Sequence, residues 1–132
     1  MEKTQKINLD ILGFWASTLC AVHCAALPLL LTFSTLGSLE FLESPVVEGV
    51  MLIIAAGLAL LSIIPSYFQK HHKVLPLLLI ILGFALIAWG RVTSVEALEA
   101  INTVIGGLLI AIAHLVNTHF LKKTESLYVS KP

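Results

Sequence analysis

Charged residues are scarce in this chain: Asp, Glu, Lys and Arg together make up only 12% of its 132 residues. A soluble globular domain carries about twice that share, so the composition argues against one. The few charges also balance to a formal net charge of zero, which gives no basis for expecting a nucleic-acid partner. The sequence contains no nucleotide-binding motif and no carboxylate pair placed for acid–base chemistry, so we predict that the protein is not an enzyme.

Cysteine is scarce as well, because Cys20 and Cys24 are the only two in the chain. Secreted domains that rely on disulfides use several bridges to hold a small core together. Two thiols four residues apart do not provide such a framework. The pair therefore indicates a site that binds metal or is redox-active.

Apolar sequence is abundant and accounts for 58% of the residues. Runs of about 20 apolar residues, enough for a helix to cross a bilayer, occur several times. We therefore predict an all-α integral membrane protein, a single domain over residues 1–132 that forms a four-transmembrane-helix bundle surrounded by membrane lipid. The predicted spans are residues 9–36, 46–68, 74–92 and 95–121. A homo-oligomer is expected if one bundle does not enclose a path.

The basic residues set the orientation of this bundle. One side of the predicted membrane carries most of them, at Lys3, Lys6, Lys70, Lys73, Lys122, Lys123 and Lys131. The other side carries only Arg91. By the positive-inside rule, the N and C termini are predicted to be cytoplasmic.

The first predicted span contains an unusual group of metal-binding residue types. On a helix, Cys20, His23 and Cys24 project to one side, because residues three and four apart are neighbours. Pro28 has no N–H to give to the carbonyl of Cys24, which is left without its helical partner. Thiolate and imidazole together select soft or borderline ions such as Hg(II), Cu(I) or Zn(II). The alternative is that the cysteines pack as small apolar residues and His23 hydrogen-bonds a neighbouring helix.

A second group of polar residues lies closer to the predicted cytoplasmic side. Asp10 is expected in the first turn of its helix, where a carboxylate favours the positive end of the helix dipole. His114 and Asn117 share one face of the last span and must look into the bundle. Their depth matches that of residues 13–17, so Asp10, Ser17, His114 and Asn117 could form a relay for an ion that the cysteines release. The alternative is an interhelical hydrogen-bonded pair that only fixes packing.

The first span follows the pattern Asp10-x-x-Gly13-x-x-x-Ser17-x-x-Cys20-x-x-His23-Cys24-x-x-x-Pro28. The last span contains Gly106-Gly107-x-x-Ile110-x-x-x-His114-x-x-Asn117. Together with the four short spans, these patterns resemble the MerC-type mercuric ion transporter family over most of the chain. The first pattern is the more specific of the two, and the adjacent glycines of the second predict a close crossing with another helix.

This resemblance implies a protein of the bacterial inner membrane that takes Hg(II) across the bilayer by thiol exchange, with Cys20 and Cys24 as the capturing pair. Better known transporters of this type have Cys-x-x-Cys in the first span and a second cysteine pair after the last. This chain has Cys-x-x-x-Cys with His23 and no later cysteine. Zn(II) or Cu(I) therefore remain alternative native ions, and binding remains an alternative to transport.

Two other functions fit the same sequence. His23 and His114 lie on different spans, and four-helix bundles can hold a haem between two histidines, so a haem-binding electron carrier is one alternative. Their unequal depths count against it. A structural membrane subunit is the other alternative, in which Cys20 and Cys24 have no role in metal binding.

Overall fold

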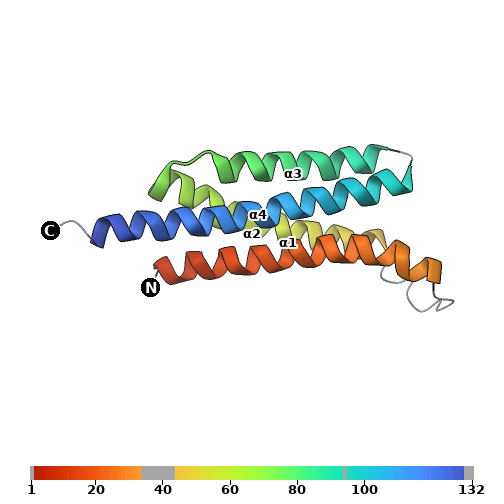
Figure 1. The fold of residues 1–132 in the computed structure, drawn as a ribbon, viewed down its shortest axis with the longest axis horizontal. Coiled ribbons are helices and arrows are strands. Elements are labelled where there is room, and N and C mark those ends of the chain that lie inside the picture. The colour runs from red at the N-terminus through yellow and green to blue at the C-terminus, as the bar shows by residue number, and fades with distance from the viewer. Residues whose placement is uncertain (1, 34–43, 94, 130–132) are drawn as a thin grey trace.

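The computed structural model describes residues 2–33, 44–93 and 95–129. Four α-helices make up most of this part of the chain: α1 (Glu2–Phe33), α2 (Pro45–Ser66), α3 (Leu75–Val92) and α4 (Glu96–Val129). They run side by side in an elongated bundle (Figure 1). Four stretches are long and apolar enough to span a membrane: Ile7–Ala26 in α1, Pro45–Lys70 in α2 and the short π-helix that follows it, Leu75–Val92 in α3 and Ala97–Thr124 in α4. The fold class and the number of spans predicted from the sequence are confirmed.

The helices extend further than the predicted spans at two places. α1 begins at Glu2 and α4 continues to Val129, because the polar residues beyond the apolar core, such as Glu2, Lys122 and Lys123, are good helix formers. Hydropathy locates the part of a helix inside the membrane and not the ends of the helix. The last residues of the predicted first span, 34–36, lie outside the described residues.

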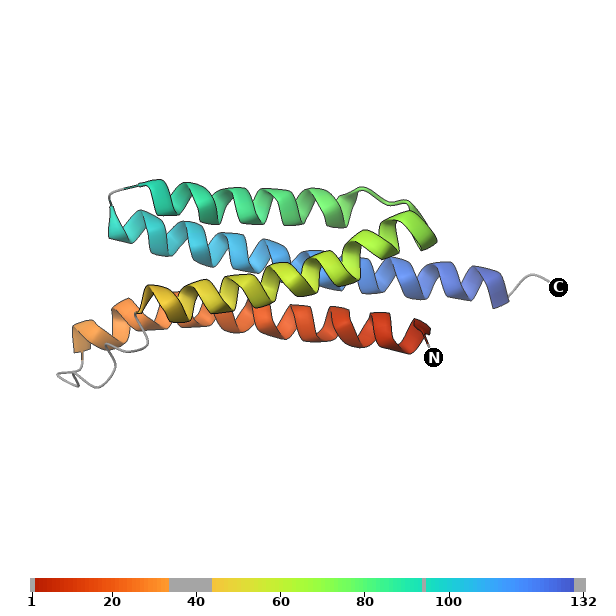
Figure 2. The same ribbon diagram turned by 180° about the vertical axis from the view of Figure 1, so that it is seen from behind.

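The two ends of the bundle differ in charge. The start of α1, the end of α4 and the connection between α2 and α3 lie at one end (Figures 1 and 2). We call this the lysine end, after Lys70, Lys73, Lys122 and Lys123. The start of α2, the end of α3 and the start of α4 lie at the opposite end, which we call the acidic end after Glu48 and Glu99. The start of α1 and the end of α4 therefore lie at the same end of the bundle, as predicted from the basic residues.

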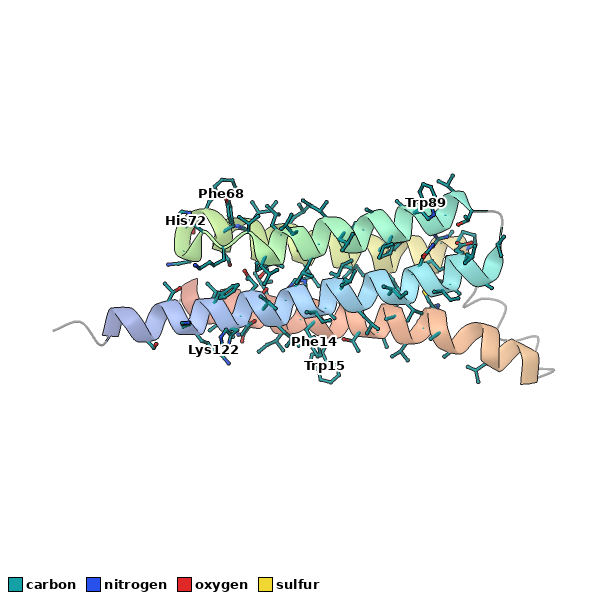
Figure 3. The ribbon with its side chains drawn as sticks, turned by 45° about the horizontal axis from the view of Figure 1, so that its top comes forward. Phe14, Trp15, Phe68, His72, Trp89 and Lys122 are labelled. Atoms are coloured by element: carbon teal, nitrogen blue, oxygen red, sulfur yellow. The ribbon has the colours of Figure 1, made fainter. Side chains whose placement is uncertain are left out.

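Exposed aromatic side chains lie toward both ends of the bundle. Phe68 and His72 are found at the end that Lys122 occupies, and Trp89 lies toward the acidic end (Figure 3). Phe68 and Trp89 are both largely exposed. Aromatic residues of this kind are typical of the interfaces between membrane and water, so they bracket the apolar thickness of the molecule.

α4 is the central helix, since it packs most extensively against α3 and α1, while α2 packs against α1. Glycine allows these contacts. A Cβ atom added at Gly106 would lie 2.6 Å from the carbonyl oxygen of Gly83 on α3. One added at Gly107 would lie 3.2 Å from Cβ of Ala21 on α1. The close crossing predicted at Gly106-Gly107 is confirmed, and it brings α4 against both neighbours at once.

A short π-helix, η2 (Tyr67–His71), follows α2 at the lysine end. Pro65 lies inside the last turn of α2 and cannot donate a backbone hydrogen bond. His72 ends the segment in the left-handed conformation, with φ of 50°. Its backbone N–H donates to the carbonyl of Tyr67 at 3.2 Å, and the chain then turns into α3.

Candidate functional site

One face of α1 carries the polar residues that the sequence singled out, and this face looks into the bundle. Asp10, Ser17 and Cys20 are at most 4% exposed, and Gly13 is also buried. On the opposite face, Trp15 is 64% exposed and Leu19 is 63% exposed. Phe14 and Trp15 project away from the other helices (Figure 3). Residues spaced by three or four along α1 therefore form a continuous buried stripe through the bundle.

The outer part of this stripe is a pair of thiols. Cys20 and Cys24 are both reduced, and a side-chain hydrogen bond joins them. Cys20 is buried, whereas Cys24 is half-buried. α1 continues as a helix through Pro28 to Phe33, so both cysteines are held on regular helix one turn apart.

The three-ligand set predicted from the sequence is only partly assembled. Within residues 2–33, 44–93 and 95–129, no three His, Cys, Asp or Glu side chains are grouped so that they could hold one metal ion. His23 is half-buried, at the edge of the face that bears the thiols. The helical period places it about 60° from Cys20 and Cys24 about 40° away on the other side. The full set of Cys20, His23 and Cys24 remains a prediction, and the thiol pair is the part that the structure brings together.

A cluster of charges joins three helices at the acidic end. Arg91 of α3 pairs with Glu48 of α2 at 2.5 Å and with Glu99 of α4 at 3.3 Å. All three side chains are partly exposed. Glu48 and Arg91 are near enough to the two thiols to act on them electrostatically. The only basic residue on the predicted outer side is therefore held between two carboxylates, beside the thiol end of the stripe.

The inner part of the stripe is centred on the carboxylate of Asp10. Its Oδ1 atom accepts a hydrogen bond from Ser62 Oγ at 2.5 Å and lies 3.0 Å from Nδ1 of His114. Its Oδ2 atom accepts a hydrogen bond from the side-chain amide of Asn117 at 2.8 Å. All four residues are completely buried. Two helices, α2 and α4, therefore supply the partners of one carboxylate on α1, inside the membrane-spanning part of the bundle.

The imidazole of His114 fits here because α1 has no side chain at the facing position. A Cβ atom added at Gly13 would fall 2.3 Å from Cε1 and 2.4 Å from Nε2 of His114. This contact confirms that His114 lies level with the start of residues 13–17. The ring therefore lies inward of the thiols, between them and the lysine end.

The prediction that Asp10 lies in the first turn of its helix is wrong. Because α1 begins at Glu2, Asp10 lies beyond its second turn and not in the first turn, too far inside the helix to interact with the free N–H groups. The carboxylate is stabilised by Ser62, His114 and Asn117 instead. The extra helical turns come from polar residues that hydropathy does not count as part of the span.

Sequence reasoning also missed the contribution of α2. Ser62 donates to Asp10, and Ser66 donates to the carbonyl of Ser62 at 2.7 Å. Both serines are completely buried. The sequence does contain a pattern that points to them. Ser62 and Ser66 are the only hydroxyl residues within α2, and they lie four residues apart on one face of a strongly apolar helix.

The depth of His114 also bears on the haem alternative. His114 packs against Gly13, and His23 lies ten residues further along α1. At 1.5 Å per residue this separates the two histidines by about 15 Å along the helix axis. One haem iron cannot be bound by both, so the geometry contradicts a haem held between His23 and His114.

The family comparison covers both parts of this stripe. A family model described as MerC mercury resistance protein matches residues 10–119. The chain belongs to the MerC family. The match begins at Asp10 and includes the thiol pair and His114, so the whole candidate site falls within the MerC region. No curated protein and no solved structure matches the chain.

Proposed function

We propose that this MerC-family protein carries a soft metal cation, with Hg(II) as the leading candidate, across the membrane that it spans. The observation that supports this most strongly is the pair of reduced, hydrogen-bonded thiols on the interior face of α1. Cys20 is only 4% exposed although it lies in an apolar span. Family membership supplies the link to mercury resistance, and the thiols supply ligands of matching softness.

The thiol pair suits capture of the ion by ligand exchange. Hg(II) is satisfied by two thiolates in a linear arrangement, so Cys20 and Cys24 are sufficient without a third ligand. Each thiol loses a proton when the metal binds, and lowering the pH should therefore weaken binding. Zn(II) and Cu(I) are alternative cargoes, and His23 would add an imidazole ligand for an ion that needs a third donor.

Charge at the two ends gives this process a direction. Glu48 and Glu99 surround Arg91 at the acidic end, where they favour the approach of a cation. The lysine end faces the cytoplasm by the positive-inside rule. In the bacterial inner membrane, a cation captured at the thiols would then pass inward along the stripe, past Ser17 toward His114, Asn117 and Asp10.

Metal binding by the purified protein in detergent tests this proposal. Wild type should bind Hg(II) tightly and with defined stoichiometry, and the double variant Cys20→Ser, Cys24→Ser should lose that binding. Titrations with Zn(II) and Cu(I) would establish the preferred ion. Ala25→Ser is a matched control, because it places a hydroxyl on the exposed side of the same helical turn and should leave binding unchanged.

Equal binding by wild type and the double serine variant would contradict the proposal. Cys20 and Cys24 would then be packing residues, as in a structural membrane subunit. Binding that depends on the cysteines would instead justify uptake measurements in sealed vesicles, which distinguish transport from binding.

A further inference from the structure

Two buried polar side-chain atoms in the described part of the chain have no hydrogen-bond partner: Oγ of Ser17 and Nε2 of His114. Both residues are at most 1% exposed. A buried donor or acceptor without a partner is costly, and each such group in a folded protein calls for an explanation. A function in binding a ligand is one such explanation.

The two atoms belong to residues at the same helix contact, between α1 and α4. His114 packs on Gly13, and the carbonyl of Ser17 would lie 3.3 Å from a Cβ atom added at Gly107. Ser17 is one helical turn from Gly13, in the direction of Cys20. The level of Gly13 is about 10 Å from that of Cys20 along the helix axis. Both unpartnered atoms therefore belong to the stretch of the stripe between the thiols and Asp10.

Hydrogen bonding prepares the imidazole of His114 to accept a ligand. Oδ1 of Asp10 lies 3.0 Å from Nδ1 and accepts a hydrogen bond from Ser62 as well. The tautomer that donates from Nδ1 to this oxygen leaves Nε2 with an unshared electron pair. Histidines that bind metal almost always donate their other ring N–H to a carboxylate, carbonyl or water in this way. Asn117 and Ser62 in turn fix the carboxylate of Asp10.

We propose that Nε2 of His114 and Oγ of Ser17 form a second binding site for the transported metal cation, on the lysine side of the thiol pair. This inference rests on the proposed function and adds a second site to it. Asp10, Asn117 and Ser62 are positioning residues for the imidazole. Gly13 is also required, since a side chain there would occupy space beside Nε2.

The second site binds the ion more weakly than the first. One imidazole nitrogen and one hydroxyl are poorer ligands for a soft ion than two thiolates. Transfer breaks two metal–sulfur bonds and forms one metal–nitrogen bond to His114 and one metal–oxygen bond to Ser17, with no change in oxidation state. The two thiolates take back from the solvent the two protons that they released when they bound the ion. A site of this kind holds the ion briefly before its release toward the lysine end.

Titration of the purified protein with Hg(II) tests this site, with binding measured by calorimetry and by the ¹⁵N NMR signals of histidine-labelled protein. Each titration is carried out on wild type and on the double variant Cys20→Ser, Cys24→Ser. It is then repeated on both proteins with His114→Gln added. The signal that disappears in His114→Gln identifies the ring. His119→Gln is the matched control, because His119 is an exposed histidine of the same helix.

Wild type should show a tight, cysteine-dependent class of sites and a weaker class. The weaker class should persist in the double serine variant, shift the Nε2 signal of His114, and be lost in His114→Gln. Asp10→Asn should weaken it by about 10-fold to 100-fold, as expected for loss of a carboxylate that orients a metal-binding histidine. If either variant folds poorly, Ser17→Ala removes one ligand without touching the Asp10 network and should also weaken this class.

A single, cysteine-dependent class of sites with an unchanged His114 signal would overturn the second site and leave the proposed function intact. If wild type and the double serine variant bind Hg(II) equally, no binding depends on the cysteines and the proposed function is overturned. The second site is then tested in the double serine variant alone. It is overturned if His114→Gln and Ser17→Ala leave the binding isotherm of that variant unchanged.

Discussion

The two parts of the α1 stripe are built in opposite ways. Cys20 and Cys24 are one turn apart on a single helix, and a hydrogen bond joins their two reduced thiols. Asp10 instead receives donors from α2 and α4. The thiols can therefore exchange their mutual contact for a metal ion without moving another helix. The carboxylate cannot lose a partner without disturbing three helices, so we expect changes at the two places to separate metal binding from stability.

The largest effect on stability should come from Asp10→Ala. This change removes the acceptor that Asp10 provides to Ser62, His114 and Asn117 inside the bundle, at roughly 1 kcal/mol for each lost hydrogen bond. We expect the free energy of unfolding in detergent to fall by about 3 kcal/mol, measured by denaturant unfolding followed by circular dichroism. Cys20→Ser, Cys24→Ser should change it by less than about 1 kcal/mol. A larger loss from the cysteine variant would reverse the comparison.

Gly13→Ala should destabilise the part of the stripe around Asp10 and His114 by steric overlap. Its Cβ atom would overlap the imidazole of His114, and overpacking of this kind costs about 1–3 kcal/mol. The matched control is Gly57→Ala, where an added Cβ would meet nothing within 4 Å and where alanine favours the helix. The same unfolding assay should show a loss for Gly13→Ala alone, with Hg(II) binding at the thiols retained. Equal stability of the two variants would show that His114 does not need the space at Gly13.

Ser62→Ala should have a smaller effect of about 1 kcal/mol, because it removes one of the donors to Asp10. Ser66→Ala should cost less still. Among the described residues, the hydroxyl of Ser66 bonds only to the carbonyl of Ser62 within its own helix, an interaction that contributes little to helix stability. Comparing the two variants isolates the contact between α1 and α2. A greater loss of stability from Ser66→Ala than from Ser62→Ala would contradict the hydrogen bond from Ser62 to Asp10.

The smallest effect on stability is expected from Arg91→Gln at the acidic end. Its ion pairs are partly exposed, and such pairs contribute less than about 1 kcal/mol. Removing the positive charge should, however, free Glu48 and Glu99 to attract cations. We expect faster capture of Hg(II) in stopped-flow measurements at low salt and no difference at high salt, where charges are screened. Slower capture at low salt would show that Arg91 assists entry.

The sequence predicts the architecture well because membrane helices are governed by a strong and simple requirement. About 20 apolar residues must cross the hydrocarbon with their backbone hydrogen bonds satisfied. The close crossing at Gly106-Gly107 could also be predicted, since a glycine pair in a membrane helix has few other uses. Local patterns of this kind do not depend on which helix is the partner.

The Asp10 network could not be predicted in full because it depends on the partner helix. Polar periodicity correctly placed His114 and Asn117 inside the bundle, but it could not identify the acceptor on α1. The assignment of Asp10 to a first turn was wrong because the helix starts earlier than its apolar part. Ser62 was missed because serine in a membrane helix often bonds to its own backbone, and only the packing of α2 on α1 shows that it reaches Asp10.

Uptake of Hg(II) into sealed vesicles tests the central claim most directly. The purified protein would be reconstituted and compared with Cys20→Ser, Cys24→Ser, with Ala25→Ser as the control. Wild type and the control should accumulate Hg(II) inside the vesicles, and the double serine variant should show only the leak of protein-free vesicles. Accumulation that is unchanged when both thiols are replaced would contradict the account.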